Sequence, residues 1–305
     1  MKEVDRLNNI EVFRETLDRI KHNAALLRLT QGAVAQTAII DAGFVSNKAP
    51  AVPMCRISFE EGLTLIPAYR FADAGKKTAV LNFANPVEPG GGVLRGANAQ
   101  EEYLCRASNL YLCLTGASAE PYYRVHNRMQ KELPRSGAFL ATDRIVYSPG
   151  VTFFREDVGY VPDDEARRPV QTYTDVWRTV DVITCAAPYF VSRQAVLPQD
   201  QLYGLFVSRI RNILEAAMEH EIEALVLGAF GCGAFHNPPA VVAKAFQDVL
   251  KQARFLHAFS DVVFAVKRSG RFCENIEVFE RAFQRPLPAG ASAFGPEENK
   301  RGFFA

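Results

Sequence analysis

Two adjacent carboxylates, Glu101 and Glu102, are the residues of this chain best placed to do chemistry. They follow the triple-glycine segment 90–92 through a short link, residues 93–99. Three consecutive glycines are costly inside a helix or a strand, because each loses much backbone freedom on folding. They suit a loop whose backbone amides approach a ligand such as a diphosphate. Carboxylates beyond such a loop suggest acid/base or glycosidic chemistry beside a phosphorylated sugar.

The glutamate pair also has a purely structural interpretation. Acidic residues are common in the first turn of a helix, where they favour the helix dipole. Asn98 and Glu101 have the spacing of a capping box, which predicts that a helix begins at Asn98. A helix start favours the ionised form of a carboxylate, so a general acid there needs burial or a nearby phosphate to remain protonated. The residues alone leave both roles open.

A second glycine loop, residues 228–235, has the same setting as the first. Each loop follows an apolar segment with strand character, residues 78–83 and 224–230, and precedes a helical pattern. In open α/β sheets ligands bind at this edge, although two ordinary strand-to-helix turns would show the same pattern. Neither loop matches a dinucleotide fingerprint or a P-loop, since the third glycine and the Gly-Lys-Ser/Thr run are missing.

Asparagine and phenylalanine side chains accompany both loops. Asn82 and Asn85 end the first apolar segment, although asparagine is disfavoured in strands. Asn85 suits either a turn before Pro86 or a contact to a sugar hydroxyl. Phe230 is expected in the core, whereas Phe235 is the candidate to pack on a ribose or a base.

Apolar strands alternate with amphipathic helices, which predicts an α/β sheet covered on both faces. Helices are predicted over residues 9–29, 68–74, 101–114, 202–220, 239–256 and 275–285. Strands are predicted over residues 37–40, 63–67, 78–83, 143–149, 151–155, 177–187, 224–230 and 261–267. Residues 121–137 are expected to be a surface stretch, and residues 157–170 an exposed loop or hairpin.

Composition bounds the remaining possibilities. The chain has 305 residues, of which 48% are hydrophobic and 23% charged, as in ordinary globular proteins. The net charge of +1 gives no global electrostatic support for nucleic-acid or membrane binding, so a local site must hold any anionic ligand. No run approaches the ~20 apolar residues of a membrane helix. The charged residues 1–6 have no apolar segment behind them, so no signal peptide is expected.

Cysteine and histidine usage points to a cytoplasmic protein without a metal centre. The six cysteines form no C-x-x-C pair, which predicts reduced and mostly buried thiols. The five histidines show no spacing typical of a zinc site. No G-x-S-x-G motif is present, which argues against an α/β-hydrolase serine.

Taken together, these segments resemble a known family. Residues 81–85 (Leu-Asn-Phe-Ala-Asn), 89–92 (Pro-Gly-Gly-Gly) and 100–102 (Gln-Glu-Glu) look like the poly(ADP-ribose) glycohydrolase signature. Residues 183–188 and 227–235 are similar to the compact microbial type of that family. The resemblance spans residues 63–267 and is looser before them. Tyr189 departs from the pattern, since asparagine is expected there.

The resemblance implies a macrodomain-like three-layer α/β/α fold with a mixed central sheet and an N-terminal helical extension. It implies an extension at residues 1–55, a catalytic domain at 56–288 and a C-terminal tail at 289–305. It further implies a monomer that needs no cofactor, takes poly(ADP-ribose) or ADP-ribosylated proteins as substrate, and yields ADP-ribose. No membrane and no direct nucleic-acid partner is expected.

The resemblance also assigns roles. Glu102 would protonate the departing ribose oxygen and then act as base toward water, while Glu101 and Gln100 would position ribose hydroxyls. Asn85 and Phe235 would lie at the distal ribose, and the two glycine loops would embrace the diphosphate. The implied catalytic residues are Glu102 and Glu101, and the implied substrate-binding residues are Gln100, Asn85, Gly90, Gly91, Gly92, Val93, Gly231, Cys232, Gly233, Ala234 and Phe235. An oxocarbenium-like transition state gains from nearby negative charge, which the substrate's diphosphate can supply.

Three activities therefore compete. The first is poly(ADP-ribose) glycohydrolase activity of the exo-acting microbial type. The second is hydrolysis of mono-ADP-ribosylated side chains, and the third is ADP-ribose binding without turnover. The intact Gln100-Glu101-Glu102 sequence argues against the third, because a binding module needs no general acid.

Overall fold

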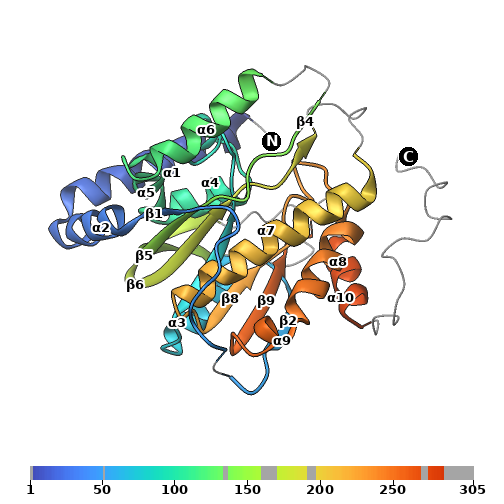
Figure 1. Cartoon of the computed structure of the whole chain (residues 1–305). Coiled ribbons are helices and arrows are strands. Elements are labelled where there is room, and N and C mark those ends of the chain that lie inside the picture. The colour runs from blue at the N-terminus through green and yellow to red at the C-terminus, as the bar shows by residue number, and fades with distance from the viewer. Residues whose placement is uncertain are drawn as a thin grey trace.

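The computed structural model describes residues 3–50, 52–132, 137–158, 170–190, 197–268 and 274–284. Its centre is a seven-stranded mixed sheet with the order β1-β5-β6-β3-β8-β9-β2 (Figure 1). The strands are β1 (Ala38–Ile40), β2 (Arg56–Glu61), β3 (Thr78–Phe83), β5 (Ile145–Val158), β6 (Val170–Cys185), β8 (Ala224–Leu227) and β9 (Asp261–Val266). Strands β6, β3, β8, β9 and β2 run parallel, whereas β1 and β5 are antiparallel to their neighbours. A separate two-stranded sheet pairs β4 (Ala138–Phe139) with β7 (Tyr189–Phe190).

Helices cover both faces of the central sheet (Figure 1). The helices on one face are α1 (Glu3–His22), α2 (Ala24–Gln36), α3 (Leu65–Asp73), α4 (Gln100–Ala107), α5 (Leu110–Thr115) and α6 (Glu120–Lys131). Those on the other are α7 (Gln199–Glu219), α8 (Pro239–Leu250), α9 (Ala253–Leu256) and α10 (Asn275–Gln284). A 3₁₀ turn, η1 (Val93–Arg95), lies between β3 and α4.

Side-chain alternation along β3 divides the core into two layers. Val80 packs in the cluster under helices α1–α6, whereas Ala79 and Leu81 pack in the cluster under α7–α10. All three residues are fully buried. Successive side chains of a strand point to opposite faces, so a continuous apolar strand is stable only when both faces are covered. The predicted three-layer α/β/α architecture with a mixed sheet and N-terminal helices is confirmed.

Several predicted elements differ from the structure. The strand predicted at residues 63–67 is wrong: the strand lies at residues 56–61, and helix α3 begins at Leu65. The helix predicted over residues 9–29 is two helices, because the Asn23 side chain accepts hydrogen bonds from the Ala25 and Leu26 amides and starts α2 there.

The stretch predicted as surface at residues 121–137 contains helix α6. Its inner face buries Tyr122, Tyr123 and His126, which the basic residues of its outer face obscure in the sequence. The helix predicted over residues 101–114 is likewise two, α4 and α5. Most of the loop predicted at residues 157–170 lies outside the described residues.

The N-terminal helices contact the segment that carries the glutamates. The Thr16 hydroxyl donates to the Arg106 carbonyl at 2.6 Å, and the Asn9 amide donates to the Gly96 carbonyl at 3.0 Å. Helix α1 therefore supports η1 and α4. The division into residues 1–55 and 56–288 stays a prediction, and the predicted tail at 289–305 lies outside the described residues.

Candidate active site

Three loops meet at one edge of the sheet. Strands β6, β3 and β8 are parallel neighbours in the sheet, with Phe83 opposite Cys185 at the ends of β3 and β6. The carboxyl ends of parallel strands lie at the same edge, where α/β sheets bind ligands. The segments singled out in the sequence after residues 83, 185 and 227 are thus brought together.

Glu101 lies under the end of strand β3. It is 3% exposed, and its Oε2 atom accepts a hydrogen bond from the Asn85 amide at 2.7 Å. Its Oε1 atom accepts one from Nδ2 of Asn82 at 3.3 Å, and that Nδ2 also donates to the Thr184 hydroxyl. Burial raises the pKa of Glu101 to about 8, against the opposing effect of the Asn85 hydrogen bond and with the added effect of the Glu102 charge. The surroundings therefore favour a neutral Glu101 at pH 7.

Glu102 is held by a different segment. Its Oε1 atom accepts a hydrogen bond from the Gly92 amide at 2.7 Å, and its Oε2 atom accepts one from the Ala99 amide at 3.0 Å. Helix α4 begins after Ala99, so Glu102 rather than Glu101 caps its first turn. The predicted capping pair is wrong by one residue, since the Asn98 side chain accepts instead from Arg106.

The first glycine segment is built against these carboxylates. Gly91 has φ +59°, and a Cβ atom there would lie 2.4 Å from Oε1 of Glu102. The backbone conformation favours glycine, and any side chain at position 91 would displace the Glu102 carboxylate. The Gly91 amide donates to the Glu88 carbonyl at 2.9 Å, and the Val93 amide donates to the Gly90 carbonyl at 3.2 Å. The amides of residues 91–93 are therefore bonded within the chain, to carbonyls or to Glu102.

Gln100 docks helix α4 on strand β3. Its Oε1 atom accepts a hydrogen bond from the Phe83 amide at 2.9 Å, and its Nε2 atom donates to the Leu81 carbonyl at 2.8 Å. The side chain thus makes the same two hydrogen bonds with β3 as a neighbouring strand residue would. This contact fixes the start of α4, and with it the two glutamates, relative to the sheet.

The second glycine loop offers unpaired amides. Within the described part of the chain, the backbone N–H groups of Gly231, Gly233, Ala234 and Phe235 donate no hydrogen bond. Successive free amides in a turn form a concave site for an anion. The Cys232 side chain points into the core, where burial raises the pKa of its thiol well above the usual value.

Asn237, which sequence reasoning did not single out, joins two of the loops. It is 2% exposed, and its Nδ2 atom donates to the Pro188 carbonyl at 2.7 Å and to the Gly231 carbonyl at 2.9 Å. The rings of Phe235 and Tyr189 pack with centroids 5.1 Å apart. The position that departs from the family pattern therefore contacts the aromatic residue expected at the ribose.

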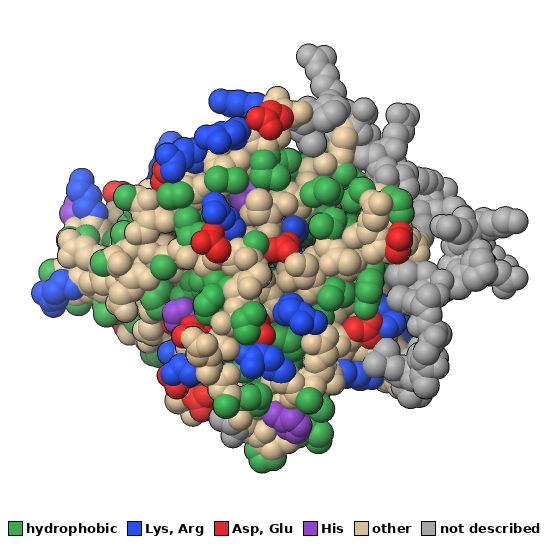
Figure 2. Space-filling model, viewed as in Figure 1, with side chains coloured by type: hydrophobic (Ala, Val, Ile, Leu, Met, Phe, Trp, Pro, Cys, Tyr) green, Lys and Arg blue, Asp and Glu red, His purple; other side chains and the backbone are tan. Residues whose placement is uncertain are grey.

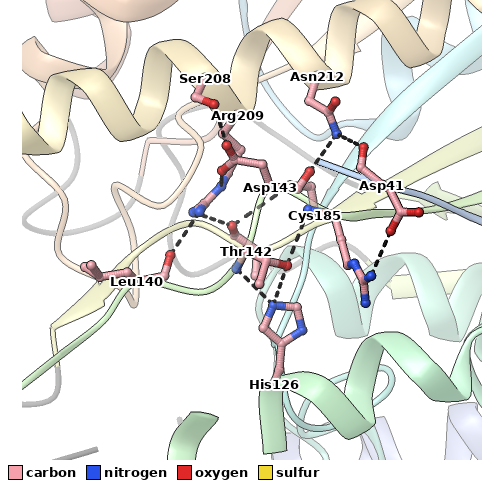
Figure 3. A network of polar contacts seen from close by, with 11 residues as sticks. Asp41, His126, Leu140, Thr142, Asp143, Cys185, Ser208, Arg209 and Asn212 are labelled. Carbon is pink, nitrogen blue, oxygen red and sulfur yellow. Dashed lines mark hydrogen bonds and ion pairs between the residues drawn. The ribbon is translucent and has the colours of Figure 1, made fainter. Parts of the chain in front are cut away.

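A buried polar network holds the loop after β6 (Figure 3). The fully buried Arg209 of α7 donates to the Ala186 carbonyl at 2.8 Å and pairs with Asp143 at 3.0 Å. Beside it, His126 accepts from the Thr142 amide at 3.0 Å, and burial lowers the pKa of His126 to about 4. The network fixes Ala186 at the edge of the site. No local sequence pattern predicted it, because its members come from distant segments of the chain.

The structure places the predicted site residues at different depths. The buried ones are Glu101, Glu102, Gly90, Gly91, Gly92, Val93, Gly231 and Cys232. Four are partly exposed: Asn85, Gln100, Gly233 and Phe235. Ala234 is exposed. Phe230 is in the core, as expected. Among the described residues, no three His, Cys, Asp or Glu side chains gather as a metal site would require. No described helix has the length and apolar character needed to span a membrane.

Comparison with known proteins identifies the family. Residues 14–156 match the family model of the microbial-type PARG, catalytic domain. The crystal structure of poly(ADP-ribose) glycohydrolase from Thermomonospora curvata is 30% identical, with a TM-score of 0.73, and the match covers 91% of this chain and 100% of that one. A structure of the same enzyme bound to the inhibitor ADP-HPD is 29% identical at the same coverage, with a TM-score of 0.73.

A second bacterial enzyme gives the same result. The Deinococcus radiodurans poly(ADP-ribose) glycohydrolase in complex with ADP-ribose is 29% identical, with a TM-score of 0.66, and the match covers 84% of this chain and 96% of that one. A search of curated proteins found no match. The family model, the shared fold and the 30% identity over most of both chains show that this chain belongs to the microbial-type poly(ADP-ribose) glycohydrolase family, whose members are glycohydrolases.

Proposed function

We propose that this chain hydrolyses the ribose–ribose O-glycosidic bond of poly(ADP-ribose) and releases ADP-ribose, with Glu102 as general acid and base. The observation that carries the proposal is the separate bonding of the two glutamates. Glu101 is bound by Asn82 and Asn85 under β3, whereas Glu102 is bound by the backbone of Gly92 and Ala99. Neighbouring carboxyl groups in different surroundings can take different roles.

In the proposed reaction Glu102 gives its proton to the ribose oxygen that leaves as the bond to C1″ breaks. The remaining ribosyl group carries oxocarbenium character, which the negative diphosphate of the substrate stabilises. A water molecule then attacks C1″, and Glu102 takes up its proton. The carboxyl group returns to its starting form, and no oxidant or metal enters the balance. Glu101, with its raised pKa, positions the ribose.

Hydrogen-bond donors without a partner among the described residues suggest the remaining contacts to the substrate. The amides of Gly231 and of residues 233–235, which donate to no described residue, are proposed to bind the diphosphate, and Phe235 to pack at the ribose. Asn85 accepts hydrogen bonds at Oδ1 from the Val87 and Glu88 amides, while its Nδ2 donates none to the described residues. That Nδ2 is proposed to donate to a ribose hydroxyl.

The other predicted site residues are proposed to hold the helix and the loops that surround the substrate. Gln100 is proposed to support the ribose site by holding α4 on β3. The glycine segment 90–92 is proposed to border the ribose and diphosphate while it fixes Glu102. Val93 and Cys232 have buried side chains and amides bonded to the Gly90 and Ala229 carbonyls, so they are proposed to shape the two loops around the substrate.

The test is incubation of the purified chain with poly(ADP-ribose), with free ADP-ribose measured by liquid chromatography. We expect ADP-ribose to accumulate until the polymer is consumed. A mono-ADP-ribosylated protein serves as the second substrate, and calorimetry measures ADP-ribose binding. Tight binding without release from either substrate would reject the enzyme and leave a binding module. Release from the mono-ADP-ribosylated protein alone would replace the polymer by side-chain adducts as substrate.

A further inference from the structure

A cavity of about 460 Å³ lies between helix α6 and the loop that joins β3 to the glycine segment. Pro89 contributes from the loop, and Tyr123, Arg124, Arg128 and Lys131 contribute from α6. The cavity therefore borders the segment that ends in Gly90–Gly92. None of the roles proposed above uses it.

The α6 side of the cavity is strongly basic. Arg124, Arg128 and Lys131 recur at spacings of four and three, which places them on one exposed face of the helix. Figure 2 shows Lys and Arg side chains gathered over the part of the surface where Figure 1 places α6. Arg124 lies 3.6 Å from Glu120, whereas Arg128 and Lys131 form no ion pair with any residue that the structure describes. The interaction with the helix dipole accounts for basic residues in the last turn, such as Arg128 and Lys131. It does not account for Arg124, which lies earlier in the helix.

The cavity wall is connected to the proposed catalytic pair through three hydrogen bonds. The Asn127 side chain of α6 donates to the Val87 carbonyl at 2.9 Å, and the Val87 amide donates to Oδ1 of Asn85 at 2.9 Å. The Asn85 amide in turn donates to Glu101 at 2.7 Å. These hydrogen bonds place the α6 wall of the cavity beside the loop that bonds Glu101.

Tyr123 places the cavity close to the carboxylates. Its side chain lines the cavity yet is only 5% exposed, and its hydroxyl has no hydrogen-bond partner among the described residues. Burial, and after it the charge of Glu101, raise the pKa of Tyr123 well above its usual value. The Tyr123 ring therefore forms an apolar part of the cavity wall between α6 and the buried carboxylates.

We propose that this basic cavity binds the diphosphate of the next ADP-ribose unit, which stays on the polymer when the terminal unit is released. The inference rests on the proposed function, because only a polymeric substrate has a second diphosphate. The amides of Gly231 and of residues 233–235 are proposed for the terminal diphosphate, and their loop leads into α8 on the opposite face of the sheet from α6. The two anion sites therefore approach the glutamates from opposite layers.

The variant that tests this site is Arg128→Gln with Lys131→Gln, which removes two cations that have no ion pair among the described residues and keeps good helix formers. The matched control is Lys21→Gln with Arg28→Gln, two exposed cations of α1 and α2 without an ion pair among the described residues. Lys21 also lies in the last turn of its helix, so the control reproduces the dipole effect.

Each protein is assayed on long poly(ADP-ribose) and on ADP-ribose that carries a 4-nitrophenyl leaving group at C1″, which lacks a second diphosphate. We expect the α6 variant to raise KM for the polymer about tenfold without changing kcat, and to weaken the salt dependence of that KM. Its rate on the small substrate and its calorimetric affinity for ADP-ribose stay at the wild-type value. The control behaves as wild type throughout.

The outcomes separate the inference from the function on which it rests. A wild-type chain that releases no ADP-ribose from polymer rejects the proposed function, whatever the variants do. An active wild type whose α6 variant shows an unchanged polymer KM overturns the subsite. An equal loss on polymer and small substrate also overturns it, because the cavity would then serve the terminal unit or the fold.

Discussion

The Oε1 atom of Glu102 lies 2.7 Å from the backbone nitrogen of Gly92, on the loop segment that has room only for glycine at position 91. The loop and the carboxylate therefore fix each other without a ligand. The glycine segment, expected from the sequence to serve the substrate, has its amides bonded within the chain. Four predictions follow from this arrangement and from the contacts around it.

Glu102→Gln should keep the shape of the side chain and remove its proton chemistry. We expect kcat on poly(ADP-ribose) to fall by about 10²–10⁴-fold, the usual contribution of a general acid or base. ADP-ribose affinity, measured by calorimetry, should change little. Glu11→Gln, at an exposed position of α1, is the control and should retain full activity. A Glu102→Gln enzyme with wild-type kcat would move the acid role to another residue.

Gly91→Ala should displace the Glu102 carboxylate. The new Cβ atom would lie 2.4 Å from Oε1 at φ +59°, so the loop or the side chain must move. A shift of about 1 Å at a reacting group costs on the order of 10²-fold in rate, and we expect at least that loss in kcat. Gly32→Ala is the control, since its Cβ would meet no atom within 4 Å inside helix α2. It should raise the free energy of unfolding by about 0.5–1 kcal/mol and keep activity. An active Gly91→Ala enzyme would show that the contact does not hold the carboxylate.

The stability of the chain should depend on pH through Glu101. Burial raises the pKa of Glu101 from its ordinary 4.5 to about 8, so the native chain holds a proton that the unfolded chain has released. This contribution to stability is complete below about pH 4.5, decreases as pH rises, and is lost above about pH 8, with a slope of about 1.4 kcal/mol per pH unit. Glu101→Gln should remove that slope.

The measurement is denaturant unfolding of the wild type and of Glu101→Gln at several pH values across this window. The variant should become more stable relative to the wild type as pH increases. A difference between the two proteins that stays constant from pH 4.5 to pH 8 would contradict the raised pKa.

Asn237→Ala should weaken ADP-ribose binding by loosening the second loop. The change removes the donor to the Pro188 carbonyl and leaves the Gly231 carbonyl with only the backbone N–H of residue 237, which costs about 1–3 kcal/mol of stability. Asn212→Ala is the matched control, because its buried side chain also donates to two carbonyls, those of Asp41 and Asp143, which lie outside the two loops that Asn237 joins (Figure 3). Both variants should lose similar thermal stability, and only Asn237→Ala should lose affinity, by about tenfold. Equal affinities in the two variants would assign Asn237 to the fold alone.

The sequence predicted the layout of the site because that layout depends on local signals. Apolar runs with strand character were predicted over residues 78–83, 177–187 and 224–230, and the structure ends these strands at residues 83, 185 and 227. Parallel strands bring such ends to one edge. The motif Gln100-Glu101-Glu102 and the two glycine loops could therefore be placed together. The three layers followed from the alternation of strands with amphipathic helices.

Local patterns failed where a residue's role depends on a distant partner. Arg106 holds the Ala97 carbonyl, Arg209 holds Ala186, and Asn237 bridges two loops, and each is unremarkable in its own segment. Strand β2 lies at the end of the sheet order, where Arg56, Glu60 and Glu61 of an edge strand hide its pattern. The helix start was wrong by one residue because Arg106 draws the Asn98 side chain away from the cap.

The contact between Gly91 and Glu102 has a consequence for how such a chain can change over generations. The strongest steric demand on the glycine comes from the enzyme's own Glu102 carboxylate. A smaller residue at position 102 would remove that contact and leave the 3.0 Å approach to Glu101 and the preference for positive φ. Loss of the glutamate would then permit loss of the glycine, while the reverse order would disable the chain first. The two halves of the motif should therefore be inherited and lost as one unit, glutamate before glycine.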